Sequence, residues 1–287
     1  MVLRNLIILG ISISVYSTTT QSAELTLDMT SYIYREVDPN DNFFMEDKSA
    51  PFLYSIGLRN WGDTKATSNT KSTNLGYLYT LEYSFGKVDY TSAGTGIMKK
   101  EYFKSRLEYY LSNNSLMGAN DLKPYIGLGY RSLLDDSGFK RSSTNHLGYD
   151  RVSQYYYIPI GAIWYISKNI SLKSQYNYFI EGKQTSYLNE ILPNVYTVNP
   201  ENIQRIGYGI DLTLRSKLNS KWSTYGFFRS WNIEDSDTVS CSALIYCYEP
   251  KNQTNEIGAG ISYHFCLLYT SDAADEGLGV DLGGRRI

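Results

Sequence analysis

The stretch that decides the fold is Asn255-Glu-Ile-Gly-Ala-Gly-Ile-Ser-Tyr-His-Phe265. Apolar or aromatic side chains alternate there with charged, polar and glycine residues. Because successive side chains of a β-strand point to opposite faces, this period of two predicts a strand with one apolar and one polar face.

The same period recurs along most of the chain. It is clearest in 75–85, where apolar or aromatic residues alternate with Gly76, Thr80, Glu82 and Ser84, and Leu78 is the one exception. Each stretch has about ten residues, the length that a tilted strand needs to cross a bilayer. The predicted strands are 25–37, 52–61, 75–85, 101–111, 123–132, 155–166, 170–181, 205–214, 222–231 and 256–265.

The expected connections alternate between long and short. If the first strand starts on the inner side, long outer loops alternate with inner turns, of which 167–169 and 216–220 are tight. Long outer loops and an even number of strands are typical of transmembrane barrels. We therefore expect an all-β fold, a transmembrane antiparallel up-and-down β-barrel of ten strands. Two longer turns, 62–73 and 112–122, leave eight or twelve strands as alternatives.

Tyrosine dominates the aromatic composition, with 28 Tyr against 4 Trp. Amphipathic rings suit a membrane interface, because one edge lies among apolar chains and the other in water. The alternative is a secreted, tyrosine-rich β-sandwich that buries the same apolar stripes in a core. The repeated ten-residue alternation favours the barrel.

The end of the last predicted strand adds a resemblance. Tyr263 and Phe265 resemble the C-terminal signal of bacterial outer-membrane β-barrel proteins, whose last residue is typically Phe with an aromatic residue two places earlier. The resemblance implies a monomeric barrel in the bacterial outer membrane, surrounded by lipid and inserted by the barrel-assembly machinery. It extends to a small porin-like class and to no closer family.

The segments that flank 24–265 carry different signals. Residues 1–23 resemble a secretory signal peptide, with Arg4, the short apolar run 6–15 and a cleavage site at Gln21-Ser22-Ala23. Residues 266–287 contain Cys-Leu-Leu-Tyr-Thr-Ser-Asp-Ala-Ala-Asp-Glu and Val-Asp-Leu-Gly-Gly-Arg-Arg-Ile, which resemble a translated sequencing adapter. We expect 1–23 to be cleaved and 266–287 to be non-native, with a natural tail, or a gene that continues past Phe265, as alternatives.

Charge and cysteine usage narrow the class further. Without 1–23 and 266–287, three of the 27 basic and four of the 29 acidic side chains are lost, so the formal net charge becomes −1. The sequence has no basic stripe of the kind that would predict a nucleic-acid partner. Cys241 and Cys247 remain as a pair, and in an exported chain they predict a disulfide. Nothing in the sequence indicates a cofactor.

Charged residues on the polar faces predict a charged lumen. It could be a narrow channel for small solutes or ions, or an ion-pair network that fills a structural barrel, since barrels of about eight strands are just filled by side chains. The predicted lumen-facing residues are Glu82, Lys104, Arg106, Glu108, Arg131, Lys173, Glu181, Arg205, Asp211, Arg215 and Glu256.

The sequence gives little support for catalysis or metal binding. His146 shows no Asp-x-His spacing of the kind that omptin proteases use, and neither it nor His264 has a recognisable serine partner for lipid hydrolysis. The acidic loop 38–50 has no EF-hand spacing, so a solvated loop is expected. We therefore expect no enzyme and no metal site. A surface adhesion or recognition barrel that acts through its outer loops is the alternative function.

Overall fold

The computed structural model describes residues 21–64, 75–113 and 122–267. Its elements are β1 (Gln21–Val37), β2 (Phe43–Thr64), β3 (Leu75–Ser92), β4 (Gly96–Asn113), β5 (Leu122–Asp136), β6 (Arg151–Tyr165), β7 (Ile170–Ser186), α1 (Leu188–Ile191), β8 (Glu201–Gln204), β9 (Gly207–Lys217), β10 (Trp222–Ile233), β11 (Val239–Ser242), β12 (Ile245–Cys247) and β13 (Asn252–Leu267). The predicted signal peptide and adapter-like tail lie largely outside the described residues.

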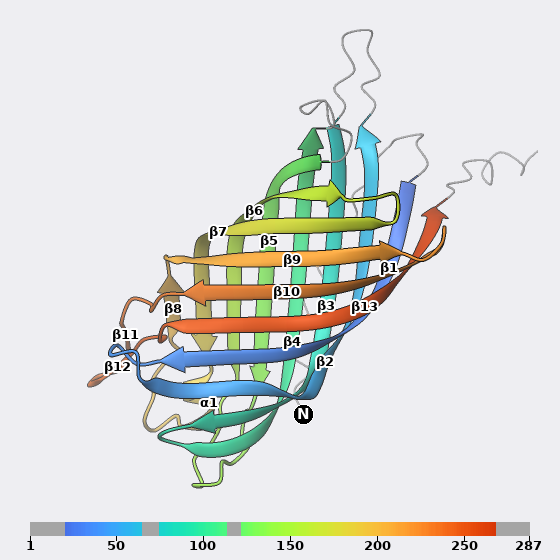
Figure 1. The fold of residues 1–287 in the computed structure, drawn as a ribbon. Helices are drawn as coiled ribbons and strands as arrows, with labels where there is room; N and C mark the ends of the chain where they lie inside the picture. Colours follow the sequence, from blue (N-terminus) through green and yellow to red (C-terminus); the bar gives the residue numbers. More distant parts are fainter. Residues whose placement is uncertain (1–20, 65–74, 114–121, 268–287) are drawn as a thin grey trace, which may run out of the picture.

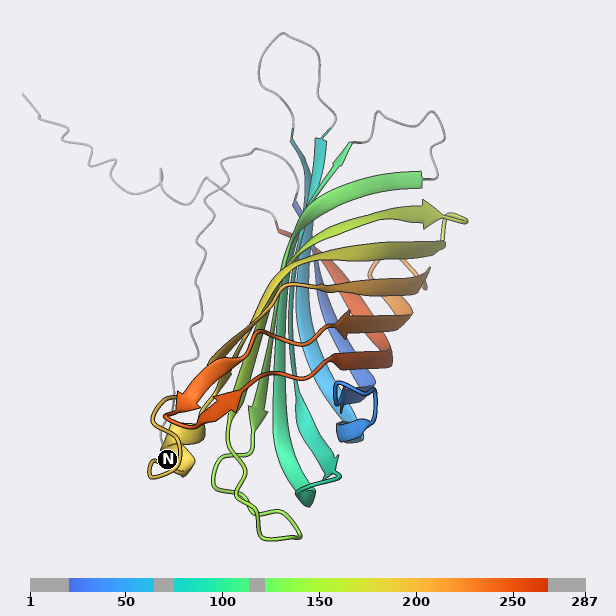
Figure 2. The ribbon, with the colours of Figure 1, turned by 90° about the vertical axis from the view of Figure 1, so that its left-hand side faces the viewer.

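Ten antiparallel strands, with β8 and β9 counted as one, close into a barrel (Figures 1 and 2). Neighbours in sequence pair in order from β1 to β7, β7 pairs with β9, and β13 pairs with both β10 and β1. The short strand β8 also pairs with β7, so β8 and β9 are two parts of one barrel strand. The predicted transmembrane antiparallel up-and-down barrel with ten strands is confirmed.

No helix in the described part of the chain is long and apolar enough to cross a membrane.

An apolar band surrounds one half of the barrel. We call this the inner half; it is the half in which β1 begins, at Gln21, and β13 ends, at Leu267. Side chains that point outward there are large, apolar and exposed, as the alternation predicted. They include Leu25, Leu27, Met29, Tyr54, Ile56, Leu58, Leu81, Ile126, Leu128, Tyr176, Tyr178, Tyr208, Ile210, Leu212, Leu214, Ile257 and Ile261. Such a band is the lipid-facing surface of a membrane barrel.

The strands continue well beyond that band into an outer half. Outward-facing side chains there are charged and exposed, among them Arg35, Lys48, Lys87, Asp89 and Lys99. A Lys or Arg at the bilayer midplane costs about 2–4 kcal/mol, so this half lies outside the lipid. The predicted outer loops are shorter than expected for this reason, because much of 43–50 and 87–100 extends the strands.

The inside of the outer half contains a hydrophobic core. Twelve buried residues form one cluster: Tyr32, Tyr34, Met45, Leu53, Val88, Tyr102, Leu133, Tyr155, Tyr157, Phe179, Trp231 and Ile233. Glycine at 209 makes room for the largest member, because a Cβ there would lie 2.7 Å from the indole ring of Trp231. The tyrosines therefore divide between the outer surface and this core, whereas the composition suggested a membrane interface only.

Candidate functional site

The barrel interior has three parts along its axis. An inner cavity lies at the inner end, a charged girdle crosses the middle, and an outer network lies near the outer loops. The girdle consists of Glu82, Lys104, Arg106, Glu108, Arg131, Asp211, Arg229 and Glu256, and the outer network of Glu36, Asp47, Lys100, Asp135, Arg151 and Glu249.

Arg106 joins opposite walls of the girdle. Its guanidinium lies 2.6 Å from Glu108 on the same strand and also pairs with Asp211 on β9. Tyr157 accepts a hydrogen bond from Arg106 Nε at 3.1 Å and donates one to Glu108 at 2.9 Å. The alternation of β4 points Arg106 and Glu108 inward, and their partners come from strands across the barrel.

Two more ion-pair groups complete the girdle. Arg229 holds Glu82 through two parallel hydrogen bonds of 2.6 and 2.8 Å, the strong bidentate arrangement. Glu256 pairs with Lys104 at 2.7 Å and with Arg131 at 3.5 Å. With Arg106, these pairs place opposite charges across the lumen from several directions.

The outer network contains two bases and four acids, all buried or nearly so. Lys100 lies 2.9 Å from Asp47 and 2.6 Å from Asp135, while Arg151 lies 2.6 Å from Glu36 and 3.8 Å from Glu249. Formal charges leave an excess of two carboxylates.

Glu249, in the loop between β12 and β13, relieves part of that excess. Burial and the neighbouring carboxylate of Glu36 raise the pKa of Glu249 to about 8, although Arg151 acts against the shift. Tyr34 donates a hydrogen bond to it at 3.1 Å. At neutral pH this carboxyl is therefore largely protonated.

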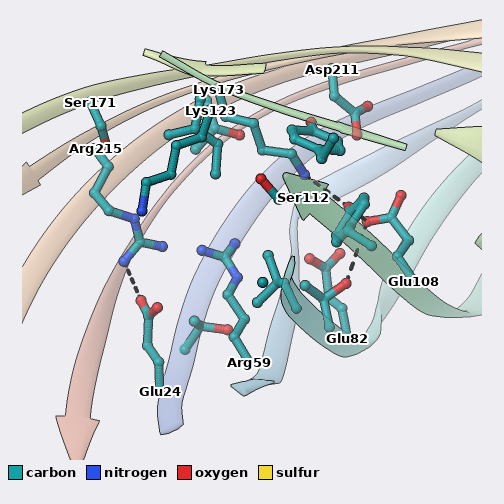
Figure 3. Close-up of a pocket in the computed structure, with 18 of the residues that line it drawn as sticks. Glu24, Arg59, Glu82, Glu108, Ser112, Lys123, Ser171, Lys173, Asp211 and Arg215 are labelled. Atoms are coloured by element: carbon teal, nitrogen blue, oxygen red, sulfur yellow. Dashed lines mark hydrogen bonds and ion pairs between the residues drawn. The ribbon is translucent and has the colours of Figure 1, made fainter. Parts of the chain in front are cut away.

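The inner cavity has a volume of about 380 Å³ and is bounded on the outer side by the girdle (Figure 3). Arg215 pairs with Glu24, and Lys173 donates a hydrogen bond of 3.0 Å to the Tyr110 hydroxyl. Arg59 and Lys123 also reach the cavity, from β2 and β5 (Figure 3).

Most of the charged residues predicted to face the lumen point into the barrel. Glu82, Arg106, Glu108, Lys173, Asp211 and Arg215 line the inner cavity, and Lys104, Arg131 and Glu256 are buried in the girdle.

Two predicted lumen residues lie elsewhere. Glu181 is exposed because a bulge in β7, where the pairing shifts between Tyr156 and Tyr157, turns both Ile180 and Glu181 outward. Arg205 lies in the break between β8 and β9 and pairs with Asp237 of an outer loop at the exposed surface. The inward orientation expected for these two was wrong, since strict alternation fails at a bulge and at a strand break.

Several interior charges were missed by the sequence argument. The inward orientation of Arg229 could not be predicted, because aromatic residues occur on both faces of β10 and the alternation indicates no apolar face. Asp47, Lys100, Asp135 and Arg151 lie in segments where loops were expected, and Glu36 lies at the end of the predicted strand 25–37. Glu24 and Arg59 alternate correctly with exposed leucines, and that signal could have found them.

The two histidines occupy opposite ends of the barrel. His146, in the loop after β5, has Nδ1 2.9 Å from the Thr144 hydroxyl. His264 lines the inner cavity, and its Nε2 lies 2.9 Å from the Ser223 hydroxyl. The sequence gave no sign of this serine–histidine pair, which joins neighbouring strands β10 and β13. The Ser223 side chain is only 1% exposed, so its hydroxyl is closed to a substrate.

Three further predictions concern the cysteines, the terminal aromatics and metals. Cys241 and Cys247 form a disulfide across the β11–β12 hairpin, with Cα atoms 6.0 Å apart. The rings of Tyr263 and Phe265 stack on one face of β13, 6.4 Å apart, and their use as an assembly signal stays a prediction. Within 21–64, 75–113 and 122–267, no cluster of His, Cys, Asp and Glu has the geometry of a metal site.

The closed barrel with its apolar band is the architecture of bacterial outer-membrane barrels. No protein-family model and no curated protein matches the chain. Similar solved structures include the outer membrane protease OmpT of Escherichia coli, with 9% identity, 86% of this chain and 97% of that chain covered and a TM-score of 0.46. Another is the Pseudomonas putida toluene transporter TodX, with 10% identity, 87% of this chain and 90% of that chain covered and a TM-score of 0.35. A third is Ail, the attachment invasion locus protein of Yersinia pestis, with 10% identity, 86% of this chain and 100% of that chain covered and a TM-score of 0.34. None of these similarities identifies a function for this chain.

Proposed function

We propose that this chain is an exported protein of the bacterial outer membrane and a structural barrel with a closed, charged lumen. The observation that carries the proposal is the filled interior. Arg106 bridges to β9 across the barrel, Arg229 holds Glu82, and the buried cluster around Trp231 fills the outer half. A solute that entered from the inner end would have to separate these ion pairs and then displace packed aromatic rings.

Barrel size supports the same conclusion. Barrels of about eight strands are just filled by side chains, whereas those of 16–18 strands keep an aqueous channel. Ten strands lie near the filled end of that range, and large inward residues fill the outer half.

Conductance in a planar lipid bilayer tests the closed lumen. We expect the refolded chain to add no stable conductance steps at moderate voltage, while a 16-stranded porin in the same apparatus gives clear steps. Heat-dependent gel mobility of the same sample, which distinguishes folded from unfolded barrels, controls for folding. Stable steps from the folded chain would show an open pore and contradict the proposal.

A second candidate function is surface recognition, favoured by the β11–β12 hairpin. The disulfide fixes this hairpin, and Leu244 at its tip is 92% exposed while Tyr246 is 68% exposed. The neighbouring outer loop contacts it, because Thr197 N donates to the Cys241 carbonyl at 2.9 Å. An exposed apolar tip held by a disulfide is suited to contact an apolar surface.

Cell adhesion tests this second candidate. Bacteria that display the protein should adhere to polystyrene more than bacteria with Leu244→Ser and Tyr246→Ser, with surface amounts matched by antibody labelling. Equal adhesion by the two strains would count against the hairpin as a contact surface.

The proposal includes no enzymatic activity. The buried Ser223 hydroxyl supports that view, because a nucleophile must reach its substrate. Hydrolysis of p-nitrophenyl esters, or cleavage of a dibasic peptide, by the refolded chain above the rate of Ser223→Ala and His146→Ala variants would overturn it.

A further inference from the structure

The charges that line the inner cavity do not balance. Six basic and four acidic side chains face it: Arg59, Arg106, Lys123, Lys173, Arg215 and Arg229 against Glu24, Glu82, Glu108 and Asp211. All four carboxylates already have a basic partner. Glu24 pairs with Arg215, Glu82 with Arg229, and both Glu108 and Asp211 with Arg106.

Three bases are left without such a partner. Within the described parts of the chain, no ion pair joins Arg59, Lys123 or Lys173 to a carboxylate. Lys173 donates a hydrogen bond to the Tyr110 hydroxyl, and Lys123 lies 5.5 Å from the centre of the Tyr165 ring. A hydroxyl and a ring face supply no anion, and Glu108, which interacts electrostatically with Lys173, is already paired with Arg106.

Two guanidinium groups also crowd the inner end. Arg59 and Arg215 both lie 5.3 Å from the centre of the Tyr225 ring. Their like charges repel, and Glu24, which interacts electrostatically with both, is in direct ion-pair contact with Arg215. An anion seated between Arg59 and the two lysines would lower that repulsion.

We propose that the inner cavity binds a small organic dianion, with phosphate or carboxylate groups, that enters from the inner end of the barrel. Arg59, Lys123 and Lys173 provide charge-assisted hydrogen bonds to its anionic groups. The lining has a formal excess of two positive charges, which matches a dianion. These lysines and Arg59 approach the cavity from different strands, so they surround a ligand (Figure 3).

The volume of the cavity and its apolar lining limit the size and polarity of the part of the ligand that joins the anionic groups. A cavity of 380 Å³ is within the range of about 300–1,000 Å³ that small-molecule sites occupy. Leu78 and Ile163 line it together with the rings of Tyr110 and Tyr165. These surfaces suit a short carbon skeleton between the anionic groups. The girdle closes the outer side, so the ligand binds at the inner end without needing to cross the barrel.

Calorimetric titration of the refolded chain tests the proposal. The probes are succinate, glycerol phosphate and inorganic phosphate, with glycerol as the uncharged control. Dodecyl maltoside micelles contain no phosphate, so binding there comes from the free anion. If the cavity also accepts a lipid headgroup, the same titration in phosphocholine micelles should give less heat, because the detergent phosphate competes for the site. We expect saturable binding of one dianion per barrel in maltoside and none of glycerol.

Variants distinguish a site from general surface charge. Arg59→Gln, Lys123→Gln and Lys173→Gln should each weaken binding by about tenfold or more, a loss typical of one charge-assisted contact. Lys221→Gln, in the turn between β9 and β10 at the same end, removes a lysine that does not line the cavity and should change affinity by less than about twofold.

Two results would overturn the inference. One is the absence of saturable heat with all three anions up to about 10 mM, which corresponds to a negligible affinity. The other is an equal loss in Lys221→Gln and in the cavity variants. Heat-dependent gel mobility confirms that each variant folds. The outcome of the conductance experiment does not affect this test, because binding at the inner end and closure of the lumen are separate properties.

Discussion

The inner and outer halves of the barrel are built from the same ten strands, yet one is hollow and the other is filled. Inward positions of the inner half carry small residues such as Thr26, Ser112 and Thr213, which leave the cavity open. Inward positions of the outer half carry large residues such as Tyr155 and Trp231, which are fully buried in the hydrophobic cluster. The diameter of the barrel is set by the number of strands, so side-chain volume decides whether its interior is empty.

The largest expected effect is at the boundary between the two halves. Arg106→Leu leaves Glu108 and Asp211 buried without their shared cation, and removal of one partner from a buried ion pair costs about 3–5 kcal/mol. We expect a loss near the upper end of that range in urea unfolding followed by tryptophan fluorescence. Adding Glu108→Gln and Asp211→Asn should recover most of it, and no recovery would mean that Arg106 contributes mainly by packing.

Truncation of one large side chain in each half should give clearly different losses of stability. Trp231 is buried and packs edge-on against Tyr157, with ring centres 4.9 Å apart. Trp231→Ala should lower the free energy of unfolding by about 3–5 kcal/mol. Leu78→Ala in the inner half only enlarges an existing cavity and should cost less than about 1 kcal/mol. Urea unfolding of both variants measures the comparison, and similar losses would contradict it.

A smaller effect is expected from one hydroxyl in the outer core. The hydroxyls of Tyr32 and Tyr102 lie 2.7 Å apart, and both side chains are buried. Tyr102→Phe leaves one of them without its partner, which costs about 1–3 kcal/mol. Thermal unfolding followed by circular dichroism should show the loss. Tyr246→Phe at the exposed hairpin is the matched control, and it should leave the transition unchanged.

The smallest expected effect depends on pH and is local to the loop that contains Glu249. The folded pKa of about 8 exceeds the ordinary value of 4.5, so the folded state holds this proton more tightly. Its stabilising contribution is therefore complete below about pH 4.5 and is lost as pH rises toward about 8. Glu249→Gln should remove that part of the pH dependence and protect residues 234–251 from protease at pH 8. Equal cleavage of the two proteins at pH 8 would argue against a protonated Glu249.

Sequence alone predicted the inner half much better than the outer half. Where lipid surrounds the barrel, outward residues are uncharged and mostly apolar, so the alternation in 75–85 and 205–214 indicates both strand and face. Beyond the lipid, outward residues such as Lys87 and Asp89 are charged, the contrast between the faces disappears, and 87–100 was taken for a loop.

The candidate site was predicted in part for a related reason. Six of the cavity charges alternate with apolar residues and were expected to face inward. Which charges pair across the barrel depends on strands far apart in sequence, such as Arg106 with Asp211, and local periodicity contains no information about that. The serine–histidine pair of Ser223 and His264 was missed because it depends on the register between β10 and β13.

Thiol accessibility tests the difference between the halves most directly. Single cysteines are placed at inward positions in a Cys266→Ser background, one at Thr213 in the inner cavity and one at Leu133 in the outer core. A charged, water-soluble thiol reagent is then added to the folded barrel in detergent. We predict rapid modification of Thr213→Cys and modification of Leu133→Cys slower by at least about tenfold, since a group buried in a core reacts only after local opening. Equal rates at the two positions would contradict a hollow inner half and a sealed outer half.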